Sequence, residues 1–154
     1  MANIEDIKKL RDETGASVSD IRNALDEAQG NEDKARELLK KRGLERAEKK
    51  SEREIKAGRV FSYIHHTGTV GGTVVLGCET DFVAKTEDFQ KLGQELAMQV
   101  SSMSEISMAP ESVEEFLRQD YIREPSKTIE TLIKEVVGRL GENIIVIDFK
   151  RFVV

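Results

Sequence analysis

Tryptophan is absent from this 154-residue sequence, and aromatic residues of all kinds make up only 5% of it. A platform that stacks the bases of a single strand needs several exposed aromatic side chains, so this class of function is disfavoured. Positive charge is also in short supply, since 24 lysines and arginines face 29 aspartates and glutamates and the net charge is −5. Neutralising phosphates requires an excess of basic residues, so we expect no nucleic-acid partner.

Cysteine and long apolar runs are scarce as well. The single cysteine, Cys78, cannot form an internal disulfide, which fits a reducing compartment. The sequence opens on a charged helical pattern without the apolar core of a secretory signal. Its longest apolar runs have the length of a strand, so we expect a cytoplasmic protein with no membrane partner.

The first 43 residues show the pattern of three short amphipathic helices. Each expected helix begins at a residue that favours the N-cap position and ends at a glycine. The expected caps are Asn3, Ser17 and Asn31, and the expected ends are Gly15, Gly30 and Gly43. Such helices are unstable singly, so we expect them to pack into a bundle resembling the ubiquitin-associated fold, whose general use is to hold protein partners. In the connection between the first and second helices, we expect Val18 to stay exposed.

Residues 44–57 consist almost entirely of glutamate, lysine, arginine, alanine and serine. Helix propensity is high, but no continuous apolar stripe accompanies it. This composition predicts a solvated helix or a mobile linker.

Residues 58–154 combine strand and helix patterns and predict an α+β domain. A strand over 59–66 and a second over 70–78 are joined by a hairpin turn, and a third strand ends the chain at 144–152. Helical patterns cover 86–103 and 129–140, and a short acidic helix begins at 109–111 and is broken by Pro125. We therefore predict a three-stranded antiparallel sheet covered by helices on one face.

The turn after the second strand is the most informative part of the sequence. It places an acidic residue, Asp81, beside a phenylalanine, Phe82, between a strand and a helix. An aromatic side chain on such a turn either tucks under its own loop or enters a pocket of a partner. The sequences around it favour the second interpretation: they are Tyr63-Ile64-His65-His66 before the turn and Gly141-Glu142-Asn143-Ile144 after it.

Taken in order, these sequences resemble the elongation factor Ts family over most of the chain. The most specific match is Thr80-Asp81-Phe82-Val83-Ala84. The N-terminal match is Leu10-Arg11, Thr14-Gly15-Ala16, Asp20, Ala24-Leu25, Gly30, Ala35 and Leu38, and the C-terminal match is Gly141-Glu142-Asn143-Ile144 with Arg151-Phe152.

The resemblance implies a guanine-nucleotide exchange factor for elongation factor Tu, without catalytic chemistry or a cofactor of its own. It implies that Asp81 and Phe82, flanked by Thr80 and Val83, enter near the magnesium and nucleotide site of the GTPase. The N-terminal module would grip a surface helix of the GTPase domain, and His65 would touch a different domain. The implied module contacts are Leu10, Arg11, Val18, Asp20 and Arg22.

Three features depart from the family pattern. Val18-Ser19 is smaller and more polar than the residues that many relatives carry in this connection. Lys85 stands where an arginine is common in the family, so the planar, forked guanidinium group is lost. The stretch from Phe116 to Tyr121 is very short where relatives insert further helices. The sequence therefore resembles a one-core form, which we expect to pair with a second copy through the sheet edge.

Other classes of function remain open from the residues. Cys78 could be a nucleophile with His65 or His66 as base and Asp81 as orienting group, or the same histidines and cysteine could bind a metal. A cysteine inside an apolar strand is usually buried and inert, which disfavours both. A protein-binding adaptor without exchange activity is the main alternative, but it would not need the sequence at Thr80–Val83.

Overall fold

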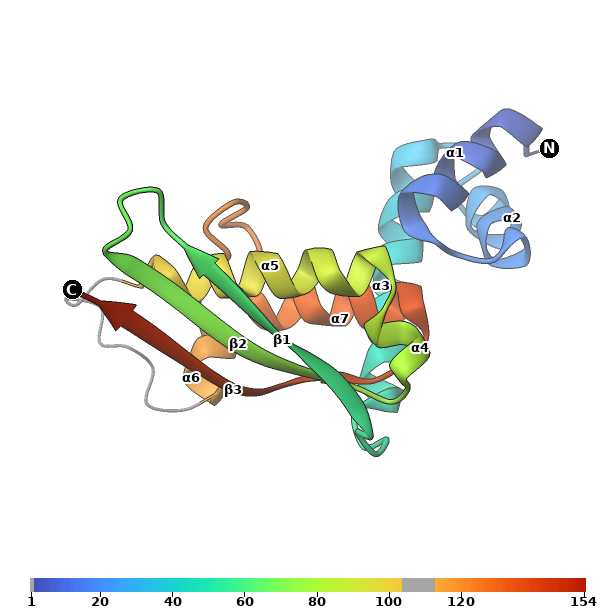
Figure 1. Cartoon of the computed structure of the whole chain (residues 1–154). Coiled ribbons are helices and arrows are strands. Elements are labelled where there is room, and N and C mark those ends of the chain that lie inside the picture. Colours follow the sequence, from blue (N-terminus) through green and yellow to red (C-terminus); the bar gives the residue numbers. More distant parts are fainter. Residues whose placement is uncertain (1, 104–112) are drawn as a thin grey trace.

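The computed structural model describes residues 2–103 and 113–154. A group of helices at the N-terminus lies beyond one end of a twisted sheet, and two long helices cover one face of that sheet (Figure 1). The predicted class, an N-terminal helical region followed by an α+β core, is confirmed. Among the described residues, no helix is both long and apolar enough to cross a membrane.

The N-terminal helices begin where the capping residues predict. They are α1 (Ile4–Thr14), α2 (Val18–Glu27) and α3 (Glu32–Lys50). Their N-caps are Asn3, Ser17 and Asn31, whose side chains each accept a backbone N–H of the first turn. Apolar faces of the three helices meet in a small core of their own that contains Leu10, Ile21, Leu25 and Leu39.

The predicted end of the third helix at Gly43 is wrong. Helix α3 continues through this glycine to Lys50, so residues 44–50 are helical. A glycine costs only about 1 kcal/mol inside a helix, and the residues that follow it favour helix strongly. Ala47 is buried in the core of the α+β part, so the C-terminal half of α3 is packed rather than solvated on all sides.

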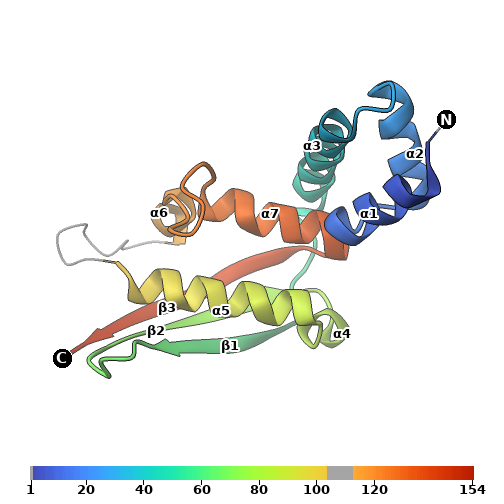
Figure 2. The same cartoon turned by 90° about the horizontal axis from the view of Figure 1, so that it is seen from above.

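The sheet has the predicted three antiparallel strands in the order β1-β2-β3. The strands are β1 (Ala57–Ile64), β2 (Val70–Cys78) and β3 (Ile144–Val153). Helices α5 (Glu87–Ser101) and α7 (Ile129–Leu140) lie on one face of it, as Figure 2 shows from above. This inner face carries Phe61 and Val74, which are buried together with Phe89 and Leu96 of α5.

The short acidic helix differs from its prediction. Its expected start at 109–111 lies outside the described residues, and α6 (Val113–Arg118) ends well before Pro125. The chain leaves the helix because backbone groups after it pair elsewhere: Ile129 donates its N–H to the Gln119 carbonyl, and Tyr121 donates to the Lys127 carbonyl. Phe116 thus lies within α6, and residues 119–128, held by these hydrogen bonds, connect α6 to α7.

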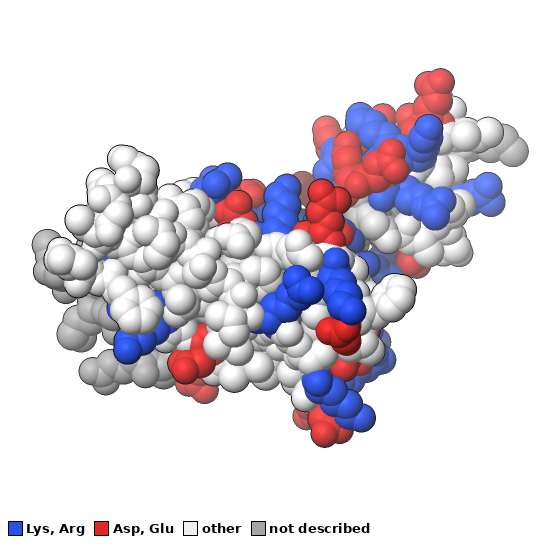
Figure 3. All heavy atoms as spheres, in the orientation of Figure 1, with Lys and Arg blue, Asp and Glu red and all other residues white. Residues whose placement is uncertain are grey.

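No helix among the described residues covers the opposite face of the sheet, which carries several exposed apolar side chains. In Figure 3 the surface over the strands is mostly white, whereas the N-terminal helices are rich in charge. We call this surface the outer face, and its exposed apolar side chains are Val60, Ile64, Ile145, Ile147 and Phe152. Exposed apolar surfaces of this kind typically mark a site of protein interaction.

Candidate partner-binding site

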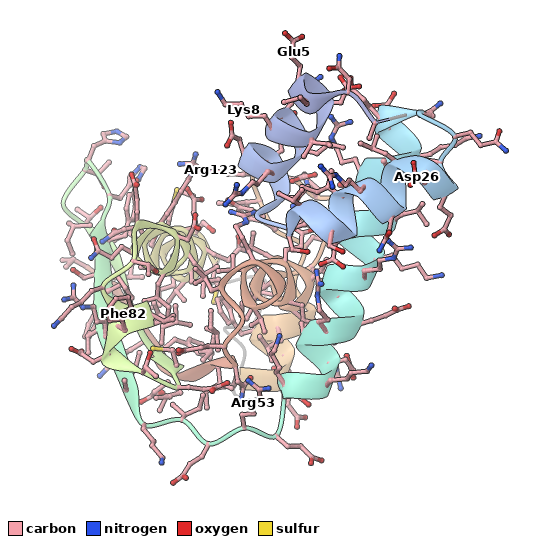
Figure 4. The ribbon with its side chains drawn as sticks, turned by 90° about the vertical axis from the view of Figure 1, so that its right-hand side faces the viewer. Glu5, Lys8, Asp26, Arg53, Phe82 and Arg123 are labelled. Carbon is pink, nitrogen blue, oxygen red and sulfur yellow. The ribbon has the colours of Figure 1, made fainter. Side chains whose placement is uncertain are left out.

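Phe82 stands on a single helical turn, α4 (Asp81–Ala84), between β2 and α5. Thr80 caps this turn, and its hydroxyl accepts the N–H of Val83 at 3.3 Å. Val83 and Ala84 are buried beneath the turn, while the Phe82 side chain is 86% exposed. Figure 4 faces this end of the molecule and shows Phe82 on α4. The phenyl group is therefore displayed to solvent from an anchored backbone.

Glu142 holds the turn from the start of β3. Its carboxylate accepts the backbone N–H of Thr80 at 2.9 Å and the Thr80 hydroxyl at 2.7 Å. Hydrogen bonds to a carboxylate are stronger than those between neutral groups. The two bonds together fix the orientation of Thr80 relative to Glu142. Sequence reasoning singled out Gly141-Glu142-Asn143-Ile144 as a motif but did not predict this contact.

Asn143 connects the same turn to the end of α3. Its backbone N–H donates to the Glu79 carboxylate at 2.7 Å, directly before Thr80. Its buried side-chain amide donates to the carbonyls of Ser51 at 3.2 Å and Arg53 at 2.9 Å. The strand end, the turn and the end of α3 are therefore tied together by hydrogen bonds.

Asp81 is an exposed carboxylate next to Phe82. The Lys85 ammonium lies 2.8 Å from it, one helical turn away. This hydrogen bond and the charge of Lys85 hold the pKa of Asp81 below its usual range, with a smaller contribution from the charge of Arg59. The turn thus presents a negative charge and an aromatic ring side by side.

The candidate residues of the N-terminal helices fall into two groups. Leu10 is fully buried and belongs to the small helical core, so it supports the surface from beneath. Val18 is half-buried against that core rather than fully exposed. Arg11 and Arg22 have exposed side chains. The surface that these helices offer is therefore mainly polar.

Asp20 has partners within the protein. Its carboxylate accepts the Ser17 hydroxyl at 2.8 Å and the Arg46 guanidinium at 2.9 Å. These two hydrogen bonds, that of Ser17 first, lower the pKa of Asp20. Arg46 lies on the continued part of α3, so Asp20 also links α2 to that part of the helix.

His65 lies far from Phe82. It follows β1 at the hairpin turn, whereas α4 follows β2 at the opposite end of the sheet (Figure 1). Its Nδ1 atom lies 3.4 Å from the Tyr63 hydroxyl, and its ring is tilted against that of His66, with 4.2 Å between the centroids. The structure thus brings the N-terminal helices and the Phe82 turn to one end and leaves His65 at the other.

The arrangement gives no support to nucleophilic or metal chemistry at Cys78. Its side chain is fully buried and its thiol donates to the Thr80 carbonyl at 3.1 Å. Burial, followed by the nearby Glu142 charge, raises the pKa of this thiol. Cys78 pairs with Ala57 at one end of β1, while the histidines follow the other end. Within residues 2–103 and 113–154, no cluster of three or more His, Cys, Asp or Glu could hold a metal ion.

Comparisons with known proteins agree on one family. The family described as "Elongation factor TS" matches residues 79–154, from the end of β2 through the Phe82 turn to the last strand. An elongation factor Ts of Rubrobacter xylanophilus is 34% identical, with 97% of either chain covered. That of Petrotoga mobilis is 37% identical over 99% of this chain and 98% of its own. That of Aquifex aeolicus is 42% identical, and the chain spans about half (49%) of its length.

Proposed function

Because this chain belongs to the elongation factor Ts family of translation elongation factors, we propose that it binds elongation factor Tu in its GDP form and promotes release of the nucleotide. One observation supports this role above all: Phe82 is 86% exposed on a turn whose backbone is bonded to Glu142. The proposed activity uses binding energy alone, with no catalytic chemistry and no cofactor in this chain. It would take place in the cytoplasm, where translation occurs.

The proposed role of Phe82 is to enter the partner beside its nucleotide site. Burying a phenyl side chain contributes about 1.5–3 kcal/mol, and each factor of ten in rate needs about 1.4 kcal/mol. Phe82 alone could therefore accelerate release by about one to two orders of magnitude. Because the turn is held before binding, little of this energy is lost in ordering it. The rest of the acceleration must come from the wider contact.

Asp81 would act on the magnesium side of the same site. Its exposed carboxylate is ionised at neutral pH, and the neighbouring Lys85 lowers its pKa further. In the bound state this charge would displace or repel the groups that hold the ion, or accept a hydrogen bond from the partner. Thr80 and Val83 would set the position of both side chains through the cap and the buried anchor of the turn.

We assign the second contact to residues 1–43, a ubiquitin-associated-like module, with residues 44–57 as a connection and residues 58–154 as the core. Arg11, Arg22 and Val18 would meet a surface helix of the partner, and Asp20 would keep α2 in place. His65, at the far end of the sheet, would touch another domain of the partner. Contacts at both ends fit a partner of several domains.

Exchange of this kind is a coupling between two ligands of elongation factor Tu. A factor that weakens GDP binding must itself be weakened by GDP by the same ratio of affinities. Titration calorimetry with nucleotide-free and GDP-bound elongation factor Tu tests this directly. We expect clearly tighter binding to the nucleotide-free form. A protein-binding adaptor would bind both forms equally, and that result would contradict the proposed exchange activity.

We also propose a homodimer, through the outer face of the sheet rather than through its edge. This face carries exposed apolar side chains that no described helix covers, and a two-fold axis would bring the same side chains of two copies together. Ile147, 50% exposed, lies next to Gly77 on this face. Sedimentation velocity should show a dimer for the parent and a monomer for Ile147→Lys. If the parent protein stays monomeric when its concentration is raised about 100-fold, the proposed dimer is contradicted.

A further inference from the structure

Helices α3 and α7 approach each other unusually closely at two glycines. A methyl group added to Gly138 would lie 2.8 Å from the carbonyl oxygen of Gly43 and 3.0 Å from its carbonyl carbon. Helices normally pack at axial distances of 8–10 Å with side chains between them, so only glycine permits backbone contact at this point. Of the N-terminal helices, α3 makes the most extensive contact with the core, where it crosses α7 (Figure 2).

Besides this glycine contact and the buried side chain of Ala47, α3 is joined to α7 by ion pairs that are partly solvated. Lys40 lies 3.2 Å from Glu135, and Glu48 lies 2.7 Å from Lys134. Lys40 and Glu135 line a cavity of about 180 Å³ whose lining also includes Arg36, Arg46 and Arg139. Exposed ion pairs contribute little to the free energy that keeps two elements in place. The backbone contact at the two glycines therefore limits how closely α3 and α7 approach each other.

The same helix is connected to the Phe82 turn at its other end. The Asn143 side chain binds the carbonyls of Ser51 and Arg53, directly after α3. The Asn143 backbone N–H binds Glu79, directly before Thr80. One helix thus carries the N-terminal module at its beginning and is hydrogen-bonded, through one residue, to the turn that presents Phe82.

We propose that the Gly43–Gly138 contact is a positioning device that fixes the span between the N-terminal module and Phe82 before the partner binds. Gly138 is the positioning residue, since its missing side chain is what allows the approach. The inference rests on the proposed exchange function, in which both parts contact the GTPase at once. Two linked contacts reinforce each other only when their spacing matches the two sites on the partner.

The two glycines provide a matched pair of variants. Gly138→Ala places a methyl group against the backbone of α3, and since carbon atoms prefer separations of about 3.5–4.0 Å, the helices must separate by about 1 Å. Gly43→Ala adds the same methyl group on the other helix of the contact, where no atom lies within 4 Å. Both substitutions favour helix equally, so the difference between them reports the contact alone.

The span is measured without the partner by pulsed electron paramagnetic resonance. Spin labels would be attached at Asp26→Cys on α2 and Gln94→Cys on α5, both exposed, while the buried Cys78 stays unlabelled. We expect one narrow distance distribution for the parent and for Gly43→Ala, and a shifted or broadened one for Gly138→Ala. A broad distribution in the parent would overturn the proposal even if Gly138→Ala did not fold.

The functional consequence is measured in the rate of GDP release from elongation factor Tu as the factor is titrated. For Gly138→Ala we expect the half-saturating concentration to rise about tenfold while the maximal rate changes less than about twofold, because the linkage of two contacts is lost but Phe82 is intact. Gly43→Ala should behave as the parent. If Gly138→Ala changes the distance between the two labels but not the half-saturating concentration, the positioning role is overturned and the exchange function is not affected. If the parent itself does not accelerate release, the exchange function fails and the proposed purpose of the span fails with it.

Discussion

At the scale of single residues, Cys78 and Phe82 lie only four positions apart but have opposite environments. Cys78 ends β2 and supports the fold, whereas Phe82 lies on the following turn and is available to a partner. The Cys78 thiol is fully buried and hydrogen-bonded, whereas the nearby Phe82 ring is 86% exposed. The sequence pattern predicted both environments. The position of Cys78 in an apolar strand predicted a buried thiol, and the position of Phe82 on a turn predicted contact with a partner. The exposure of Val18 was harder to predict, because three short helices can rotate their apolar faces.

An exposed phenyl ring contributes almost nothing to folding. We therefore expect Phe82→Ala to change the free energy of unfolding by less than about 0.5 kcal/mol, as is usual for surface substitutions. Chemical denaturation followed by circular dichroism measures this value. Phe89→Ala is the matched control, since Phe89 is fully buried and its loss should cost about 3–5 kcal/mol. A comparable loss for Phe82→Ala would mean that the ring packs on its own protein.

At the scale of elements, the α4 turn is held in part by Glu142, which lies 62 positions after Thr80 in the sequence. In Glu142→Ala the Thr80 N–H and hydroxyl lose their acceptor. We expect a loss of about 1–3 kcal/mol in stability, because two hydrogen bonds to a carboxylate are removed. Hydrogen exchange should become faster in residues 79–85. Glu37→Ala, an exposed position on α3, is the control, and equal effects of the two variants would contradict the role of Glu142.

Most elements could be predicted because their signals are local. The caps Asn3, Ser17 and Asn31 mark helix starts by hydrogen-bonding to the first turn, and the strands follow from alternation. The continuation of α3 past Gly43 could not be predicted in this way. It depends on Ala47 and on the contact with Gly138, which lies 95 positions away in the sequence. The hydrogen bonds of Glu142 to Thr80 are equally non-local.

At the scale of the whole molecule, the described residues form two separate hydrophobic cores. A cavity-forming substitution in the smaller core should therefore act locally. Leu25→Ala removes a side chain that is only 2% exposed, and we expect a cost of about 2–5 kcal/mol. Hydrogen exchange should become faster in α1 and α2 and stay unchanged in β2. Equal acceleration in β2 would show that the two cores unfold as one unit.

We propose above all that Phe82, held by a rigid turn, promotes nucleotide release from elongation factor Tu. The most direct measurement is the release rate of a fluorescent GDP analogue from elongation factor Tu of the same organism, with the parent or with Phe82→Ala at saturating concentration. We predict acceleration by the parent and a maximal rate about tenfold or more lower for Phe82→Ala, since the ring contributes about 1.5–3 kcal/mol. Equal acceleration by the two proteins would contradict the role of Phe82, and no acceleration by the folded parent would contradict the function itself.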